Sequence, residues 1–293
     1  MKLVARLKTI KELDKLDQLG IDVFCLDTEF TTKKISQFTI SEIKEIVDFT
    51  ESKHKATYVL INKMIHESDI ESLNSFLKSI KDVKASGIVI NDLSVYVIAK
   101  KYGLENKIIY QPGTMNTDSF SAEYFNDRMI KGITISREIT LDEVNVIIKK
   151  PLNIEFSIIG HGYLDMFYSK RKLLTNYLTH KNISGKKLLG NYKLRLNEEI
   201  RPNDMYPVFE DEFGTHIFRS KKLISYEVLE HLSGNISDFF IERIFLDDEE
   251  FYDSIKLYRN KITIEDFLLK YRDYNSGFYF QRTEKVKGEL NES

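Results

Sequence analysis

The sequence predicts an α/β fold of the (β/α)8 TIM-barrel-like kind, with a partly β insertion after the seventh strand. Short apolar, β-branched runs alternate with stretches of helical periodicity through the first 159 residues. The runs recur at roughly 20 to 35 residues, which is the spacing of repeated βα units. Seven such units exceed an ordinary doubly wound sheet, and they fit an eight-stranded barrel that lacks only its last strand.

We expect the runs to be strands buried on both faces, because most of them are apolar without alternation. The eighth strand is expected later in the chain, at Arg243–Leu246. The seven earlier runs are Lys2–Leu7, Asp22–Leu26, Ala56–Ile61, Gly87–Ile90, Lys107–Tyr110, Gly132–Ile135 and Asn153–Ile159.

The stretches between the runs carry helix signals. The first shows apolar residues at helical spacing and ends at Gly20, a typical helix stop. Thr140 and Glu143 have the spacing of a capping box. The acidic run after Phe245 fits a helix N-terminus, where negative charge meets the positive end of the helix dipole. Helix starts are expected at Thr9, Ser41, Asp69, Thr140 and Asp247.

The βα rhythm breaks between Gly160 and Gly234, where tyrosines and glycines replace long helical patterns. We expect four parts: barrel units one to seven in 1–159, a basic, aromatic insertion in 160–234, the last strand and helix in 235–274, and a C-terminal tail in 275–293. Active sites of such barrels lie at the carboxyl ends of the strands. The insertion is therefore expected to cover the site.

The composition excludes several classes of protein. Apolar residues make up 42% of the 293 positions and charged residues 30%, which excludes a disordered chain. A net charge of −2 excludes a uniformly basic coat for nucleic acid. The single cysteine, Cys25, cannot form an intrachain disulfide or a four-cysteine metal site, and we expect it as a small buried hydrophobe in a strand.

The sequence also predicts where the protein works. The N-terminus has no apolar core of the length that a signal peptide needs. No stretch approaches the roughly 18 uncharged apolar residues of a membrane span. We therefore expect a cytoplasmic protein with no membrane contact.

Polar side chains follow the predicted strands, at the end of the barrel where active sites lie. Most have a simple structural explanation, because Asp, Asn and Thr are ordinary cap and loop residues. Arg137 and Glu138 are harder to explain in this way, because a separate capping box follows them. The candidate catalytic residues are Asn62, Asn116, Arg137, Glu138 and His161.

Several common catalytic motifs are absent from the sequence. The six histidines form no HExxH pair and have no CxxC partner, so we expect no metal and no cofactor. No P-loop, GxGxxG or GxSxG string occurs. The sequence therefore supports neither a nucleotide-binding fold nor a serine hydrolase.

The strongest local signal is a basic segment from Asp165 to Arg195. It contains eight Lys and Arg residues and one acid, a local charge of +7, with aromatic residues between the cations. Cations that follow phosphates and rings that stack on bases are typical of proteins that bind single-stranded nucleic acid. A solvated loop whose rings fold inward is the alternative. The candidate RNA-binding residues are Tyr168, Lys170, Arg171, Tyr177, Lys186, Lys187 and Tyr192.

The string HG-x4-F-x-SKR-x-LL-x-NY, from His161 to Tyr177, resembles the core motif of the collagenase-like peptidase family U-32. SREITLDE at Ser136–Glu143, the opening KTIKELDKLDQLGIDVF, FLDDEEF near Phe245 and SGFYF at Ser276 are also similar to this family. The resemblance implies a barrel-like fold, with peptidase activity, RNA modification or quinone hydroxylation as the function. The variety most similar to this sequence is the tRNA-hydroxylation proteins. These are implied to make 5-hydroxyuridine at the wobble position of tRNA, using prephenate as an oxygen-independent source, and in low-GC Gram-positive bacteria to occur as a pair of related proteins.

Departures from the family pattern narrow these implications. Cluster-bearing members carry cysteines where this sequence has Asp165 and Lys172, and the family's motif glutamate falls on Ser157. A four-cysteine cluster cannot assemble on a chain with one cysteine. The resemblance therefore implies either a member of a cluster-free branch or a partner subunit that has lost redox chemistry.

Three hypotheses remain open. The first is a cluster-free tRNA-hydroxylation subunit in which Arg137 pairs an anion and His161 moves a proton. The second is a peptidase, which needs a nucleophile–base pair or a metal-bound water. The third is a non-catalytic subunit that positions RNA for a partner. The expected partners are tRNA and a cysteine-bearing paralogue of the same family.

Overall fold

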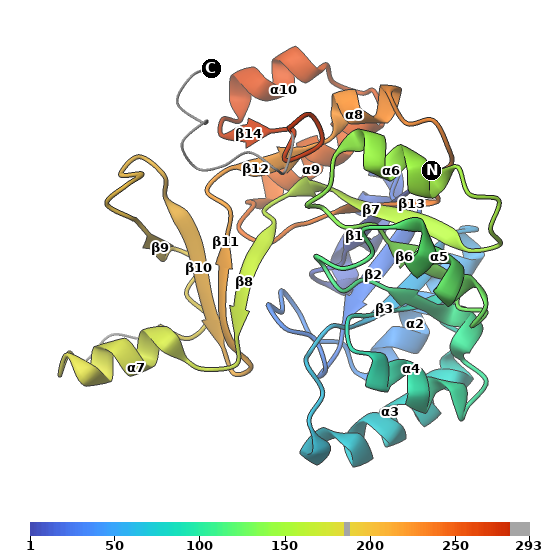
Figure 1. The fold of residues 1–293 in the computed structure, drawn as a ribbon. Coiled ribbons are helices and arrows are strands. Elements are labelled where there is room, and N and C mark those ends of the chain that lie inside the picture. The colour runs from blue at the N-terminus through green and yellow to red at the C-terminus, as the bar shows by residue number, and fades with distance from the viewer. Residues whose placement is uncertain (185–187, 282–293) are drawn as a thin grey trace.

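The computed structural model describes residues 1–184 and 188–281 of the chain. Eight parallel strands form a closed barrel, because β13 pairs with both β1 and β7 (Figure 1). The predicted TIM-barrel-like fold is confirmed. The barrel strands are β1 Lys2–Arg6, β2 Val23–Asp27, β3 Ala56–Ile61, β4 Gly87–Ile90, β5 Ile108–Tyr110, β6 Gly132–Thr134, β7 Glu155–Gly162 and β13 Asp238–Ile241.

The barrel strands are buried on both faces, as their continuous apolar runs predict. All five residues of β2 are buried, and Cys25 among them is 2% exposed. The expectation that Cys25 serves as a small buried hydrophobe is thus confirmed.

The helices pack around the barrel between successive strands (Figure 1). Gly20 ends α1 in the left-handed region with a φ of +106°, and Thr140 and Glu143 form the predicted capping box. The predicted cap at Ser41 is wrong: Thr39 caps the helix, and Glu42 completes a capping box. The helices are η1 Ile10–Glu12, α1 Leu13–Leu19, α2 Ile40–Ser52, η2 Glu67–Asp69, α3 Ile70–Val83, α4 Leu93–Lys100, η3 Glu105–Lys107, α5 Ser119–Asn126, α6 Leu141–Ile148, α8 Tyr226–Glu230, α9 Asp248–Tyr258 and α10 Ile264–Lys270.

The predicted eighth strand at Arg243–Leu246 is also wrong, because β13 at Asp238–Ile241 closes the barrel. Both stretches are short apolar runs, and periodicity cannot separate them. The strand pairing shows which run belongs to the barrel, because Lys2 of β1 lies opposite Asp238. The stretch that follows β13 turns away from the barrel, with Phe245 at a φ of +63°.

An antiparallel sheet and one helix project from the barrel after β7 (Figure 1). We call this part, within residues 165–184 and 188–218, the arm. It contains β8 Asp165–Ser169, α7 Leu173–His180, β9 Arg195–Leu196, β10 Tyr206–Asp211 and β11 Gly214–Phe218, in the sheet order β8-β11-β10-β9. Two short strands, β12 Lys222–Ile224 and β14 Tyr274–Asn275, extend the barrel sheet beside β7.

None of the helices within residues 1–184 and 188–281 has both the length and the apolar character that crossing a membrane requires.

Candidate functional site

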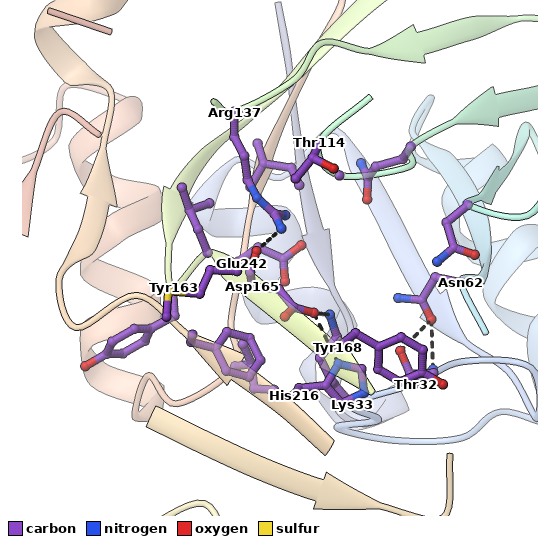
Figure 2. A pocket seen from close by; sticks show the side chains of 18 of the residues that line it. Thr32, Lys33, Asn62, Thr114, Arg137, Tyr163, Asp165, Tyr168, His216 and Glu242 are labelled. Atoms are coloured by element: carbon purple, nitrogen blue, oxygen red, sulfur yellow. Dashed lines mark hydrogen bonds and ion pairs between the residues drawn. The ribbon is translucent and has the colours of Figure 1, made fainter. Parts of the chain in front are cut away.

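A cavity of about 290 Å³ lies where the barrel meets the arm (Figure 2). Each of the eight barrel strands contributes to its wall from the carboxyl end or from the loop that follows. This is where barrel enzymes place their active sites. The polar and charged wall residues include Arg6, Thr32, Lys33, Asn62, Asn91, Gln111, Thr114, Arg137, Asp165, Tyr168, His216 and Glu242.

A buried ion pair lies at the base of this pocket. The Arg6 guanidinium donates to both carboxylate oxygens of Asp27, at 2.8 and 2.5 Å. Burial alone would lower the pKa of Arg6, but the Asp27 carboxylate outweighs it and the pKa is raised. The charge of Arg6 is therefore neutralised within the protein.

The loop after β2 connects the barrel to the arm through Lys33. The Lys33 ammonium lies 2.5 Å from Asp165 Oδ2 on β8, and the Lys33 main-chain N–H donates to Asp211 Oδ2 at 2.8 Å. Its own carbonyl accepts from Arg6 at 2.9 Å. One residue thus ties two strands of the arm to the base of the pocket.

Asp165 also holds His216, which lies on the neighbouring strand β11. His216 Nδ1 is 3.2 Å from Asp165 Oδ2, and the Tyr168 ring stacks on the imidazole with centroids 4.6 Å apart. Burial would raise the pKa of Asp165, but the opposing Lys33 charge and the His216 hydrogen bond lower it. Burial lowers the pKa of His216, so its ring is neutral and donates through Nδ1.

Arg137 brings a positive charge to the opposite wall (Figure 2). Its guanidinium donates to the main-chain oxygen of Asp165 and lies beside Gly113. Among the residues that the structure describes, no carboxylate lies within ion-pair distance of it. The pocket can therefore offer this charge to a small anion.

The predicted catalytic residues do not all meet at this pocket. Asn62 and Arg137 line it, and Asn62 Oδ1 accepts from the Thr32 main-chain N–H at 2.8 Å. Asn116 is buried outside the wall, with a φ of +67°, and donates to the main-chain oxygen of Thr134. Glu138 is exposed and lies outside the wall.

His161 lies within β7 and is fully buried outside the pocket wall. Its Nε2 is 2.7 Å from Ser254 Oγ and 3.1 Å from the Tyr274 hydroxyl, and its Nδ1 is 3.1 Å from the Tyr258 hydroxyl. Burial, with a smaller contribution from Lys222, lowers the pKa of His161 to about 3. This neutral histidine therefore belongs to an internal polar network.

The predicted RNA-binding residues take different positions on the arm. Lys170 and Arg171 are exposed after β8, and Tyr177 on α7 is 57% exposed. Tyr168 lines the pocket, whereas the Tyr192 ring packs 4.6 Å from that of Phe209 and its hydroxyl donates to the Lys34 carbonyl. The remaining two, Lys186 and Lys187, lie outside the described residues.

Sequence reasoning did not assign Lys33, His216 or Glu242 to the site. Lys33 and Asp165 are 132 positions apart, and His216 and Asp165 are 51 apart, so no local motif joins them. Within the described ranges, no group of three or more His, Cys, Asp or Glu side chains is placed to hold a metal ion.

Known proteins are similar to this chain both in sequence and in fold. The tRNA hydroxylation protein P2 of Bacillus subtilis (strain 168) is 25% identical over 92% of this chain and 94% of its own length. The tRNA hydroxylation protein P1 of the same strain is 23% identical, over 48% of this chain and 33% of its own length. A solved structure, the U32 peptidase Mk0906, shares the fold with a TM-score of 0.50 at 17% identity, covering 82% of this chain and 92% of that one.

The model of Peptidase family U32 matches residues 8–287, which is nearly the whole chain. The match includes the barrel from α1 onward, the pocket wall apart from Arg6, and the arm. This chain is a member of peptidase family U32.

Proposed function

We propose that this chain is a subunit of a tRNA wobble-uridine hydroxylation system, that it binds tRNA, and that it holds a small anion at the barrel mouth. The observation that carries the proposal is the Arg137 guanidinium, which lies without an ion pair among the described residues in a pocket between the barrel and the arm. The relative that matches over nearly its whole length is named for tRNA hydroxylation.

The arm supports the RNA part of the proposal through its exposed groups. Lys170 and Arg171 are exposed at the end of β8, where their charges are free to meet phosphates. Phe167 and Tyr177 are 45% and 57% exposed, and such rings stack on unpaired bases. Phe167 also lines the pocket, so one RNA strand that follows β8 can bring a nucleotide to the barrel mouth.

A peptidase would need a nucleophile–base pair, and Ser254 and His161 are a possible one, with Ser254 Oγ 2.7 Å from His161 Nε2. Both residues are 0% exposed, and neither lines the pocket. A peptide bond cannot reach a hydroxyl sealed in this way. The geometry therefore favours tRNA modification over proteolysis.

A cysteine-bearing paralogue remains part of the proposal. Bacillus subtilis has two proteins named for tRNA hydroxylation, P1 and P2, and both are similar to this chain. We expect the chain with the cysteines to supply any chemistry that needs a cluster, because Cys25 is single and buried.

The test is mass spectrometry of tRNA nucleosides from a strain that lacks this protein. We expect the modifications derived from wobble 5-hydroxyuridine to disappear and the wild-type gene to restore them. If a gene carrying Arg137→Ala restores them fully, the anion site is not needed for the modification, and the chain serves only to position the RNA for its partner. Unchanged nucleosides in the deletion strain, with any paralogue also deleted, would refute the proposed function.

A further inference from the structure

Arg219 follows β11 directly, beside the pocket but outside its wall. Its main-chain N–H donates to the Leu164 carbonyl at 3.0 Å. Its guanidinium carbon lies 5.0 Å from the centre of the Phe278 ring, which supports one face of the group. The main chain and this ring together fix where the positive charge lies.

Arg219 has no ion-pair partner within the described part of the protein. Its Nη1 is buried without a hydrogen-bond partner, and no described carboxylate lies within ion-pair distance. Burial lowers the pKa of Arg219, Glu138 acts in the opposite direction, and Arg137 lowers it further. The nearby charge of Arg137 thus adds to the cost of burial.

Three other arginines in the molecule differ from Arg219 because each has an acid beside it. A buried cation costs several kcal/mol unless it is paired, so proteins usually place an acid beside it. Both arginines that are buried within the described ranges follow that rule: Arg6 pairs with Asp27, and Arg243 pairs with Glu12 and Asp248. The half-buried Arg259 pairs with Asp22 as well.

Arg137 and Arg219 also contact neighbouring residues of one segment. Arg137 donates to the main-chain oxygen of Asp165, and Arg219 donates through its own main chain to that of Leu164. Arg137 lines the pocket and the main chain of Arg219 contacts the same segment, Leu164–Asp165, while neither guanidinium has a paired acid among the described residues. An oxyanion would stabilise such an arrangement.

We propose that Arg219 is a second anion-binding residue, and that with Arg137 it holds a carboxylate or phosphate group at the edge of the pocket. The inference rests on the proposed function only in taking this anion as part of the ligand of that pocket. A free small molecule and an RNA backbone phosphate carry the same chemistry, and the test separates them.

The test measures thermal unfolding of the full chain at constant ionic strength with chloride, malonate, inorganic phosphate or a short single-stranded RNA. We expect malonate or phosphate to raise the melting temperature above the chloride value. Arg219→Gln should weaken the apparent affinity for the anion by about tenfold or more, which is the usual effect of losing a hydrogen bond to a charged group. The exposed Lys221→Gln removes the same charge two residues away and should leave the affinity unchanged.

The anion-free melting temperature separates binding from a structural role. Because Arg219→Gln removes an unpaired, half-buried charge, the variant should unfold at the same or a higher temperature than the wild type in chloride. If the variant unfolds at a lower temperature and keeps its response to anions, the inference is wrong. A response to RNA alone that depends on Arg219 would identify the anion as a backbone phosphate, and no Arg219-dependent response to any probe would refute the site.

This experiment is independent of the cellular one. Binding of malonate that depends on Arg219, together with unchanged tRNA nucleosides in the deletion strain, would refute the proposed function and keep the anion site. Loss of the modifications in the deletion strain without any Arg219-dependent binding would do the reverse.

Discussion

The guanidinium of Arg137 reaches across the pocket to the arm, where it donates to the main-chain oxygen of Asp165. Replacement by Ala removes the fork that pairs with a carboxylate or phosphate. We predict that Arg137→Ala lowers tRNA modification in cells about tenfold or more, on the scale of a lost charged hydrogen bond. Affinity for tRNA should stay within about twofold, because backbone contacts on the arm position the RNA.

Arg137→Lys and Arg128→Ala are the controls for this prediction. Lys keeps the charge but not the planar fork, so it should restore modification only in part. Arg128 stacks on Tyr124 at the outer side of the barrel, and its loss should change nothing. If Arg137→Ala weakens tRNA binding as strongly as it lowers modification, Arg137 serves the RNA and not the pocket.

The tyrosines of the arm differ in how much ring they present. Tyr177 is 57% exposed, whereas Tyr168 and Tyr192 stack on His216 and Phe209. We predict that Tyr177→Ala costs about 1–3 kcal/mol of RNA-binding free energy, with no change in salt dependence. Fluorescence anisotropy with a labelled anticodon stem-loop measures both quantities.

The other two tyrosines provide the comparison. Tyr168→Ala and Tyr192→Ala should lower the melting temperature, since each ring packs inside the arm or against it. If Tyr177→Ala leaves binding unchanged while Tyr168→Ala weakens it without loss of stability, the stacking ring belongs to the pocket.

At the scale of elements, the helix α7 depends on one buried carboxylate. Glu210 on β10 is 0% exposed and accepts from the main-chain N–H groups of Leu174 and Thr175, at 2.8 and 3.2 Å. It thus caps the start of α7 from a neighbouring strand, and its charge opposes the positive end of the helix dipole.

We predict that Glu210→Gln destabilises the docking of α7 by about 1–2 kcal/mol, which is the range of a lost helix cap. Hydrogen exchange of residues 173–180 should accelerate, while exchange in the barrel strands stays as in the wild type. The exposed Glu199→Gln has the same charge change and should leave exchange unaltered. Equal exchange in Glu210→Gln and the wild type would show that α7 is held by other contacts.

The elements also show what local sequence signals can predict. α3 begins after Asp69 and buries the apolar face that the sequence predicts, and the predicted capping box forms at Thr140. Both features depend on residues only a few positions apart. The position of β13 depends instead on pairing with β1 across more than 230 residues, and a local pattern does not contain that information.

The site shows the same limit. Asn62 and Arg137 follow strands, so the barrel rule brings them to one pocket. Lys33 and His216 come from a loop and from the arm, and they join Asp165 only through the docking of the two. His161 continues β7 inside the sheet, where a neutral histidine satisfies buried hydroxyl groups.

At the scale of the whole molecule, the net charge of −2 hides the basic segment from Asp165 to Arg195. We predict that Lys170→Ala with Arg171→Ala weakens tRNA binding with little sequence preference. The slope of log affinity against log salt should flatten by roughly 1 to 1.5, at about 0.7 per phosphate on a single strand. The same slope in the variant and in the wild type would mean that these cations do not meet phosphates.

Buried neutral histidines make the stability of the whole fold depend on pH. His161 has a pKa of about 3 in the folded protein, whereas a histidine in the unfolded chain titrates near 6.5. As the pH falls below about 6.5, the unfolded chain takes up a proton that the folded protein does not bind. The stability that neutral His161 contributes is therefore complete above that pH and decreases below it, by up to about 1.4 kcal/mol per pH unit.

We predict that His161→Gln reduces the slope of unfolding free energy against pH by about one proton between pH 6 and pH 4. Urea unfolding at a series of pH values measures the slope, and His180→Gln, at an exposed position on α7, is the control that should keep the wild-type slope. His216 also has a lowered pKa and contributes its own proton in the same direction, so part of the slope should remain in His161→Gln. If the slope does not change, His161 binds its proton equally in the folded and unfolded chains and the prediction is wrong. The sign of its contribution would reverse only if nuclear magnetic resonance found the ring of His161 titrating above pH 6.5 in the folded protein.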